Sequence, residues 1–489
     1  MRFLLATAAL ALATPAFAQD KDAPPVKIEA QSVEKRMSGV FGGQRVDFTV
    51  TMADTLLGDE EAPGAVVVTT AYVKQPRDPS RPVTFLFNGG PGSGSLWLQM
   101  GAFGPKRVAI PSDARDDGAP PYPILDNPDS LLDVTDLVFI DPPGTGFSYV
   151  TENGKGEEYY GVTQDAKAVA QTIRHWVDAN GRWNSPKFIG GESYGTTRSA
   201  AVVRELEGAY SDLAFNGVIL ISAILDFAFD REVQGNELPF INALPSMAAA
   251  AWYHGKTDAP ALEPFVAEAR AFALGPYATA LLKGQNIGAD EYARTRAGLA
   301  RYTGLSETYL DRANLRVELG RFYKELLRDR GLTIGRLDAR YTGRDYDNAG
   351  ETPDADPSFY GIDAGYTAAI NAFTRETLGY DTRRVYQSIG FEPNAAWDWR
   401  IPGGNAYFNV TPWLARAMRE NSGMGVFVGQ GYYDFATPFL GAEYSLSRYG
   451  VPQDRVEFEY YEAGHMMYAR DEDRVKLSAD VRDFIRRYQ

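Results

Sequence analysis

The stretch from residue 186 to 195, Pro-Lys-Phe-Ile-Gly-Gly-Glu-Ser-Tyr-Gly, places the strongest constraint on how this chain folds. Residues 188–190 are typical of the end of a short buried strand, and residues 196–206 have apolar side chains at helical spacing. The Gly-x-Ser-x-Gly pattern between them is typical of a nucleophile elbow, in which a strand turns sharply into a helix and leaves one serine exposed. Glycine is needed on both sides because the neighbouring strand and helix leave no room for a Cβ atom. The pattern therefore predicts Ser193 as a nucleophile.

The composition is that of an ordinary globular enzyme, and it argues against several classes of function. The 489 residues exceed the usual size of one domain, so we expect one large domain with an insertion, or two domains. A net charge of −15 without any Lys/Arg-rich run argues against nucleic acid as a partner. The absence of cysteine excludes disulfides, thiol catalysis and thiolate metal sites. Asp354 and Asp356 lack the spacing of a metal loop, so we expect no metal and no other cofactor.

The first 18 residues have the pattern of a secretory signal peptide. Arg2 supplies the charged start, residues 4–14 form the apolar stretch, and Ala16-Phe17-Ala18 forms the cleavage box. We expect cleavage after Ala18 and a periplasmic or secreted protein. No later stretch reaches 18 apolar residues, so stable membrane insertion is not expected.

Strand and helix patterns alternate near both ends of the chain, and a long helical region separates them. The predicted strands lie at 46–50, 66–73, 83–87, 136–140, 217–222, 425–429 and 456–460, with predicted helices at 163–179 and 471–488. This order predicts an α/β fold with a mostly parallel central sheet and an inserted, mainly helical cap. We divide the chain into a signal peptide (1–18), a first part of the core (19–228), the cap (229–395) and a second part of the core (396–489).

An elbow serine needs a histidine base, and the chain contains only three histidines. His175 falls inside a predicted helix, and His254 falls at a helix end before a glycine, so both positions favour structural roles. His465 follows the last predicted strand, where the chain order Ser…Asp…His places a catalytic base. Asp434 follows the preceding strand and is the candidate for the orienting acid, the alternative being an Asx-type turn residue.

The predicted strand 83–87 runs into a glycine-rich loop, Asn88-Gly89-Gly90-Pro91-Gly92. Glycines allow backbone N–H groups to approach a developing alkoxide, so this loop fits an oxyanion hole. The alternative interpretation is a tight turn.

Taken together, these motifs resemble the serine carboxypeptidase family. The motifs occur in the order found in that family, from about residue 80 to 470, and are Asn88-Gly89-Gly90-Pro91-Gly92, Gly104-Pro105, Asp141-Pro142 with Gly144-Thr145-Gly146-Phe147-Ser148-Tyr149, Gly191-Glu192-Ser193-Tyr194, Asp434 and Ala463-Gly464-His465-Met466. The resemblance implies an α/β-hydrolase fold and removal of C-terminal residues through an acyl-enzyme. The absence of cysteine indicates a bacterial-type member, because disulfides are common in eukaryotic ones.

The resemblance also implies roles for individual residues. Ser193 is expected to be the nucleophile, His465 the base and Asp434 the acid. Backbone N–H groups of Gly90 and Tyr194 are expected to form the oxyanion hole. The substrate's terminal carboxylate is expected to bind at Asn88, Gly89 and Glu192.

One departure from the family pattern concerns carboxylate recognition. The family usually has a glutamate two residues before Gly104-Pro105, and this chain has Ala102 there. Two close carboxyl groups share one proton, so without that partner Glu192 should ionise more readily and repel a free carboxylate, unless another acid substitutes or burial alone keeps it neutral. Arg198 and Lys106 are candidates to offset the resulting negative charge.

The sequence therefore predicts an exported serine carboxypeptidase that acts on peptides with a free C-terminus. An esterase or acyltransferase with the same three catalytic residues stays open, because that chemistry differs only in the acceptor and the side pockets. A catalytically silent binding protein on the same scaffold is the alternative from a different class.

Overall fold

The computed structural model describes residues 26–207, 213–401 and 407–489, so the predicted signal peptide, Met1–Ala18, lies outside the described residues. In the described part of the chain, ten strands form one sheet in the order β1-β2-β3-β7-β4-β9-β10-β13-β14, with β8 paired to β3. Their bounds are β1 (Ser32–Phe41), β2 (Gln44–Gly58), β3 (Pro63–Lys74), β4 (Val83–Phe87), β7 (Asp136–Asp141), β8 (Tyr149–Val150), β9 (Lys187–Glu192), β10 (Gly217–Ile221), β13 (Gly425–Gly431) and β14 (Val456–Tyr461).

The sheet has an antiparallel edge and a parallel body. β1, β2, β3 and β7 pair antiparallel to one another, whereas neighbours from β7 to β14 pair parallel. In the parallel body, β4 lies between β7 and β9, so the chain order reverses once, as at a topological switch point. This arrangement confirms the α/β-hydrolase fold and the mostly parallel sheet expected from the sequence.

Helices cover both faces of the sheet and complete the core. They are α1 (Val162–Ala179), α2 (Tyr194–Glu207), α12 (Thr411–Glu420), α13 (Phe439–Leu446) and α14 (Asp471–Tyr488). The strands alternate between two hydrophobic clusters, as the two-residue period of a strand requires: Val218 and Leu220 belong to one cluster, Ile219 and Ile221 to the other. The first cluster also contains residues of α1, α2 and α12, and the second contains residues of α14.

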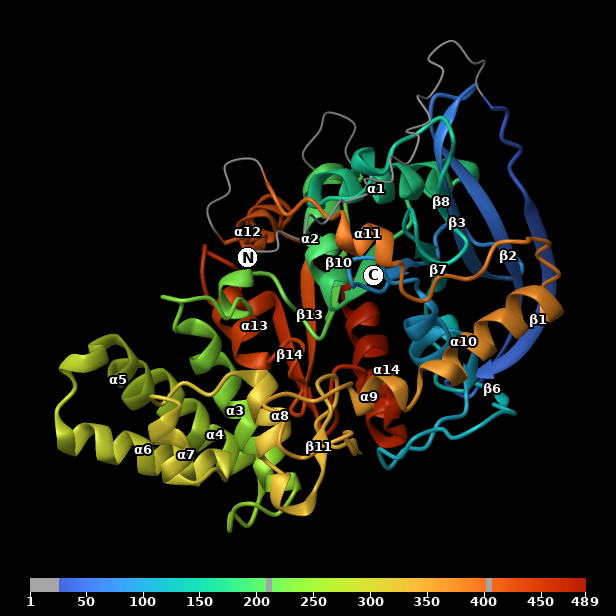
Figure 1. Cartoon of the computed structure of the whole chain (residues 1–489). Helices are drawn as coiled ribbons and strands as arrows, with labels where there is room; N and C mark the ends of the chain where they lie inside the picture. Colours follow the sequence, from blue (N-terminus) through green and yellow to red (C-terminus); the bar gives the residue numbers. More distant parts are fainter. Residues whose placement is uncertain (1–25, 208–212, 402–406) are drawn as a thin grey trace, which may run out of the picture.

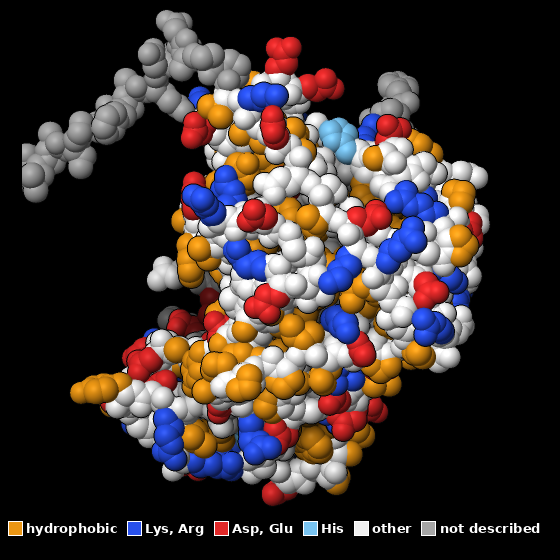
Figure 2. Space-filling model, turned by 90° about the vertical axis from the view of Figure 1, so that its right-hand side faces the viewer, with side chains coloured by type: hydrophobic (Ala, Val, Ile, Leu, Met, Phe, Trp, Pro, Cys, Tyr) orange, Lys and Arg blue, Asp and Glu red, His pale blue; other side chains and the backbone are white. Residues whose placement is uncertain are grey.

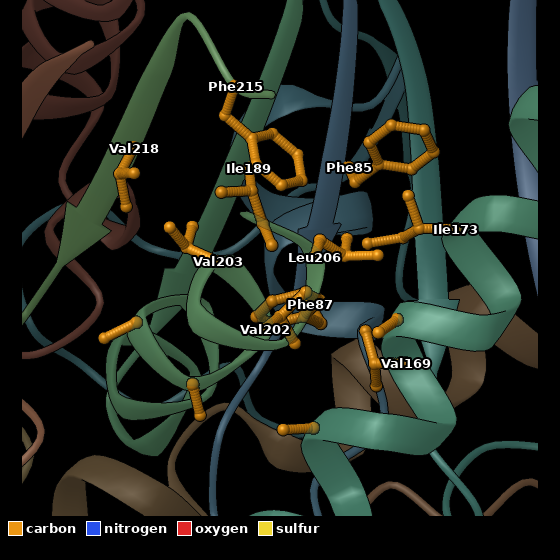
Figure 3. Close-up of a cluster of buried hydrophobic side chains, with 14 of the residues drawn as sticks. Phe85, Phe87, Val169, Ile173, Ile189, Val202, Val203, Leu206, Phe215 and Val218 are labelled. Atoms are coloured by element: carbon orange, nitrogen blue, oxygen red, sulfur yellow. The ribbon is translucent and has the colours of Figure 1, made fainter. Parts of the chain in front are cut away.

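Figure 3 shows part of the first cluster, in which side chains of α1 and α2 meet those of β4 and β9. Ile173 of α1 points toward Phe85, and Val169 lies one turn away on the same helix, while Val202 and Leu206 of α2 lie near the strands. The helical spacing of these residues gives each helix one apolar stripe, which is buried on the sheet. The same packing fixes α2 directly behind the elbow.

The helices that follow β10 are α3 (Leu238–Tyr253), α4 (Leu262–Phe272), α5 (Ala278–Lys283), α6 (Ala289–Thr303), α7 (Glu307–Arg312), α8 (Leu319–Glu325), α9 (Pro357–Tyr360), α10 (Asp363–Asn371) and α11 (Phe391–Ala395). Short strand pairs are β5 (Lys106–Val108) with β6 (Ile124–Asp126) and β11 (Thr333–Ile334) with β12 (Thr342–Gly343). Figure 1 shows α3 to α8 gathered at one end of the molecule, away from the blue strands β1 and β2.

The region predicted to form one cap, 229–395, divides between different cores. Residues 241–334 build a third hydrophobic cluster with residues 432–440. The later part returns to the sheet domain, where Tyr366, Phe373, Tyr380 and Tyr386 join the second cluster. Phe373 packs on Tyr72 of β3, and the three tyrosines pack on Trp97 or Phe147. Residues 357–395 therefore pack against the core of the sheet domain and do not extend the first helical group.

One face of the molecule carries mixed charge. Figure 2 shows Lys and Arg side chains interspersed with Asp and Glu on one face, without a large area of a single sign. Of the helices in the described ranges, none combines the length and the apolar character that crossing a membrane demands.

A buried ion-pair network holds β3, β7 and the end of α1 together. Asp136 Oδ1 accepts hydrogen bonds from the Lys74 N–H and from Arg81 Nε, both at 3.0 Å. Asp136 Oδ2 accepts one from Arg182 Nη1 at 2.7 Å. The three charged side chains are at most 9% exposed, so each guanidinium depends on this one carboxylate for its counter-charge.

We predict that Asp136→Asn lowers the stability of the fold by about 3 kcal/mol, because it leaves buried charges without a partner. The control is Glu420→Gln, which removes an exposed pair with Arg416 within α12 and should cost less than about 0.5 kcal/mol. The measurement is the urea midpoint of unfolding by circular dichroism. Equal midpoints for the two variants would contradict the argument.

Candidate active site

Ser193 stands in a strained turn between β9 and α2, as the Gly-x-Ser-x-Gly pattern predicted. Its φ is +61°, a conformation that costs energy for a residue with a side chain. A Cβ on Gly191 would lie 2.1 Å from the Gly195 carbonyl oxygen, so only glycine fits there. The Ser193 N–H donates to the Ile221 carbonyl at 3.0 Å, which ties the turn to β10. Ser193 remains partly exposed between two buried neighbours.

The loop after β4 lies directly against the elbow. A Cβ on Gly89 would lie 2.5 Å from the Tyr194 nitrogen, and Gly90 has a φ of +99° that favours glycine. Among the described residues, neither the Gly90 nor the Tyr194 N–H has a hydrogen-bond partner. Two free N–H groups beside Ser193 are the donors that an oxyanion hole requires.

Arg198 of α2 holds this loop in place. Its Nη1 donates to the Asn88 carbonyl at 2.6 Å, and its Nε pairs with Asp165 at 2.7 Å. Arg198 is 1% exposed, and its charge is neutralised by the buried carboxylate of Asp165. Lys106 pairs instead with Asp126 on β6. Neither cation is therefore available to offset Glu192, contrary to the expectation from the sequence.

Asp434 and His465 lie on the loops that follow β13 and β14. His465 Nδ1 is 2.8 Å from Asp434 Oδ2. A carboxylate only accepts hydrogen bonds, so Nδ1 carries the proton and Nε2 is left able to accept one. Burial acts to lower the pKa of His465, but the negative charge of Asp434 raises it overall. Burial acts to raise the pKa of Asp434, but His465 and the hydrogen bonds from Thr437 lower it overall.

Two residues that the sequence analysis missed position these groups. The Thr437 hydroxyl donates to Asp434 Oδ2 at 2.7 Å, and the N–H groups of Ala436 and Thr437 donate to Asp434 Oδ1. Ser222, after β10, donates its hydroxyl to the His465 carbonyl at 2.6 Å. Thr437 follows Asp434 by three residues, which is a capping-type spacing that sequence could have suggested. Nothing in the sequence links Ser222 to His465.

Glu192 is buried beside Ser193 and is held by two donors. Asn88 Nδ2 donates to Oε1 at 2.9 Å, and the Tyr468 hydroxyl donates to Oε2 at 2.6 Å. Burial raises the pKa of Glu192 to about 7, although His465, Tyr468 and Asn88 each act to lower it. Ready ionisation of Glu192 is expected from the sequence only if burial does not keep it neutral, and burial does oppose the charge here. Burial is the main cause that opposes the charge, and the negative charge of Asp434 adds to it. Tyr468, another residue missed from sequence, supplies the neighbouring polar group.

A cavity of about 190 Å³ brings these groups together. Asn88, Gly89, Gly90, Glu192, Ser193 and His465 line it, whereas the buried Asp434 and Tyr194 do not. The other lining residues include the apolar side chains of Trp97, Leu337, Phe359, Ile389, Ala436 and Met466. Pockets for drug-sized ligands usually measure about 300–1,000 Å³, so this cavity suits a short terminal segment.

The two other histidines lie away from this cavity. His175 is exposed on α1. His254 ends α3, and its Nε2 lies 2.7 Å from the Ala339 carbonyl, to which it donates. Within the described ranges, no group of three or more His, Asp or Glu side chains is arranged to hold a metal ion.

Comparison with known proteins adds a family match. Residues 71–259 match the serine carboxypeptidase family. The match includes the Asn88 loop and the elbow, and it ends before Asp434 and His465. No match was found among curated proteins.

Several solved structures are similar at low identity. A proline iminopeptidase from Mycobacterium smegmatis has 12% identity and a TM-score of 0.37, with 89% of this chain and 98% of that chain covered. A carboxylesterase from the thaumarchaeon Nitrososphaera gargenis has 11% identity and a TM-score of 0.39, with coverage of 88% and 99%. An epoxide hydrolase variant from Aspergillus niger has 11% identity and a TM-score of 0.34, with coverage of 90% and 79%.

The fold is shown by the strand order, and the sequence match gives a similarity over residues 71–259. By these two observations, the chain is a protein of the α/β-hydrolase fold that is similar, over residues 71–259, to the serine carboxypeptidases.

Proposed function

We propose that this protein is a serine carboxypeptidase that removes C-terminal residues from peptides. The observation that carries the proposal is Glu192, a buried carboxyl beside the partly exposed Ser193, with a pKa of about 7. Below that pH it is a neutral hydrogen-bond donor, which can bind a terminal carboxylate without repelling it. The family match over residues 71–259 supports the same activity.

In the proposed mechanism, Ser193 attacks the carbonyl carbon of the last peptide bond. His465 Nε2 accepts the serine proton and then donates it to the leaving amine, while Asp434 holds the imidazole in the required tautomer. The N–H groups of Gly90 and Tyr194 stabilise the oxyanion. The C–N bond breaks, the C-terminal residue leaves, and Ser193 carries an ester. Water, activated by His465, then hydrolyses that ester and restores the hydroxyl.

Substrate orientation follows from the position of Glu192 beside the nucleophile. With the terminal carboxylate held at Asn88, Gly89 and Glu192, only the last peptide bond reaches Ser193. The small cavity volume of about 190 Å³ is consistent with such a terminal substrate. An esterase with the same catalytic residues would have no need of a neutral carboxyl at this position.

We predict that Ser193→Ala abolishes labelling by a fluorophosphonate probe and lowers kcat by several orders of magnitude, about 10⁶ by analogy with another serine hydrolase. His175→Ala is the matched control and should keep kcat within about tenfold, because His175 lies outside the cavity. The substrates are blocked dipeptides as free acids, the same dipeptides as amides, and simple esters. Hydrolysis of the esters alone would make the protein an esterase.

We also predict that the titration of Glu192 makes kcat/KM depend on pH. For free-acid substrates, kcat/KM should rise as His465 loses its proton and fall as the pH passes about 7, where Glu192 becomes charged. In Glu192→Gln the side-chain amide stays neutral, so the fall above pH 7 should disappear. The rise should also move to lower pH, because the charge of Glu192 helps to raise the pKa of His465.

The control for this experiment is the C-terminal amide of the same dipeptide, which has no charge for Glu192 to repel. Its profile should lack the fall above pH 7 in both proteins. A fall of equal size for acid and amide would assign the titration to another group.

We further propose that the protein is exported, on the basis of the charged start, apolar stretch and Ala-x-Ala box within Met1–Ala18. The mature chain is then expected to begin at Gln19 in the periplasm or outside the cell. Amino-terminal sequencing of protein isolated from its native host is the measurement. Folded cytosolic material that still begins at Met1 would refute export.

A further inference from the structure

Arg336 is a cation in the active-site cavity to which the sequence analysis gave no role. It lies between β11 and β12, and its side chain lines the same cavity as Ser193 and His465. The residue is exposed, and among the described residues its guanidinium forms no ion pair or hydrogen bond. An arginine can donate five N–H groups in a fork that matches a carboxylate.

The backbone around Arg336 is bound to the loops that carry Asp434 and His465. The His465 N–H donates to the Leu337 carbonyl at 2.6 Å, and the Phe435 N–H donates to the Arg336 carbonyl at 3.1 Å. Asp338 Oδ2 accepts the Gly464 N–H at 3.0 Å. Segment 336–338 is thus held to the loops of both catalytic groups, and it keeps Arg336 at a fixed place relative to them.

The nearby acidic side chains leave the guanidinium available for a ligand. Asp356 accepts the N–H groups of Arg336 and Leu337 and the hydroxyl of Ser358, so its oxygens are already occupied. Loss of solvent contact raises the pKa of Asp230, and the positive charge of Arg336 acts to lower it. The two groups therefore influence each other, but they do not form an ion pair. A carboxylate in the cavity would be the first group to neutralise Arg336 directly.

We propose that Arg336 is a specificity-determining residue that binds a carboxylate of the substrate. This inference rests on the proposed peptidase function and adds a cap residue to it. The carboxylate is either the terminal one or that of an acidic side chain beside the scissile bond. Both present the same planar pair of oxygens to the guanidinium, and a substrate series can tell them apart.

The experiment compares wild type with Arg336→Gln on four blocked dipeptides. The C-terminal residue is either neutral or glutamate, and the C-terminus is either a free carboxylate or an amide, which gives the four substrates. A charge-assisted hydrogen bond contributes about 1.5–3 kcal/mol, so kcat/KM should fall about tenfold or more for the substrate that carries the relevant carboxylate. A loss confined to free acids assigns the terminal carboxylate, and a loss confined to glutamate substrates assigns the side chain.

Two further variants make the comparison specific. Arg344→Gln removes the same charge from an exposed position that does not line the cavity. It should therefore change kcat/KM only slightly, and to the same extent for all four dipeptides. Arg336→Lys keeps the charge without the fork, and should retain part of the preference. The inference is overturned if Arg336→Gln changes charged and neutral substrates to the same extent, or if Arg344→Gln reproduces its pattern.

Failure of the proposed function gives a different result. If peptides are not cleaved but esters are, the peptidase assignment fails for wild type and variants alike. The ratio of kcat/KM between wild type and Arg336→Gln can then be measured with esters that do or do not carry a carboxylate. A loss in Arg336→Gln restricted to the charged esters would still support Arg336 as the carboxylate-binding residue.

Discussion

The close approach between the Asn88–Gly90 loop and the nucleophile elbow is the contact on which the rest of the site depends. It is possible only because Gly89 has no Cβ, which would lie 2.5 Å from the Tyr194 nitrogen. This contact places the free N–H groups of Gly90 and Tyr194 beside Ser193. It also brings Asn88 within 2.9 Å of Glu192. Arg198 stabilises this contact, because its buried guanidinium donates a hydrogen bond to the Asn88 carbonyl.

The cap and the catalytic groups are coupled through the loop that carries Asp434. Tyr433 and Phe435, on either side of Asp434, are buried in the hydrophobic cluster formed by the cap helices. Segment 336–338 then joins this loop to the one that carries His465. A displacement of the cap would therefore disturb the positions of Asp434 and His465 together.

The carboxylate recognition proposed for this chain would use a single buried carboxyl, that of Glu192. The family pattern pairs two glutamates, and Ala102 removes the second. Burial nevertheless raises the pKa of Glu192 to about 7, and the Tyr468 hydroxyl occupies one of its oxygens. A neutral carboxyl can thus be produced by desolvation rather than by a shared proton. Arg336 lies in the same cavity as a separate positive charge.

The sequence by itself determined the elements and the groups at the strand ends. Apolar runs and the glycine pattern around Ser193 predicted β4, β9 and the parallel body of the sheet, because strand period and turn sterics act locally. It could also nominate Asp434 and His465, since each follows a predicted strand. The contacts of Tyr468, Ser222 and Arg336, and the separate packing of residues 357–395, were decided only by the tertiary structure. Each depends on segments far apart in the chain, and burial, which sets the pKa of Glu192, is a property of their packing rather than of any local pattern.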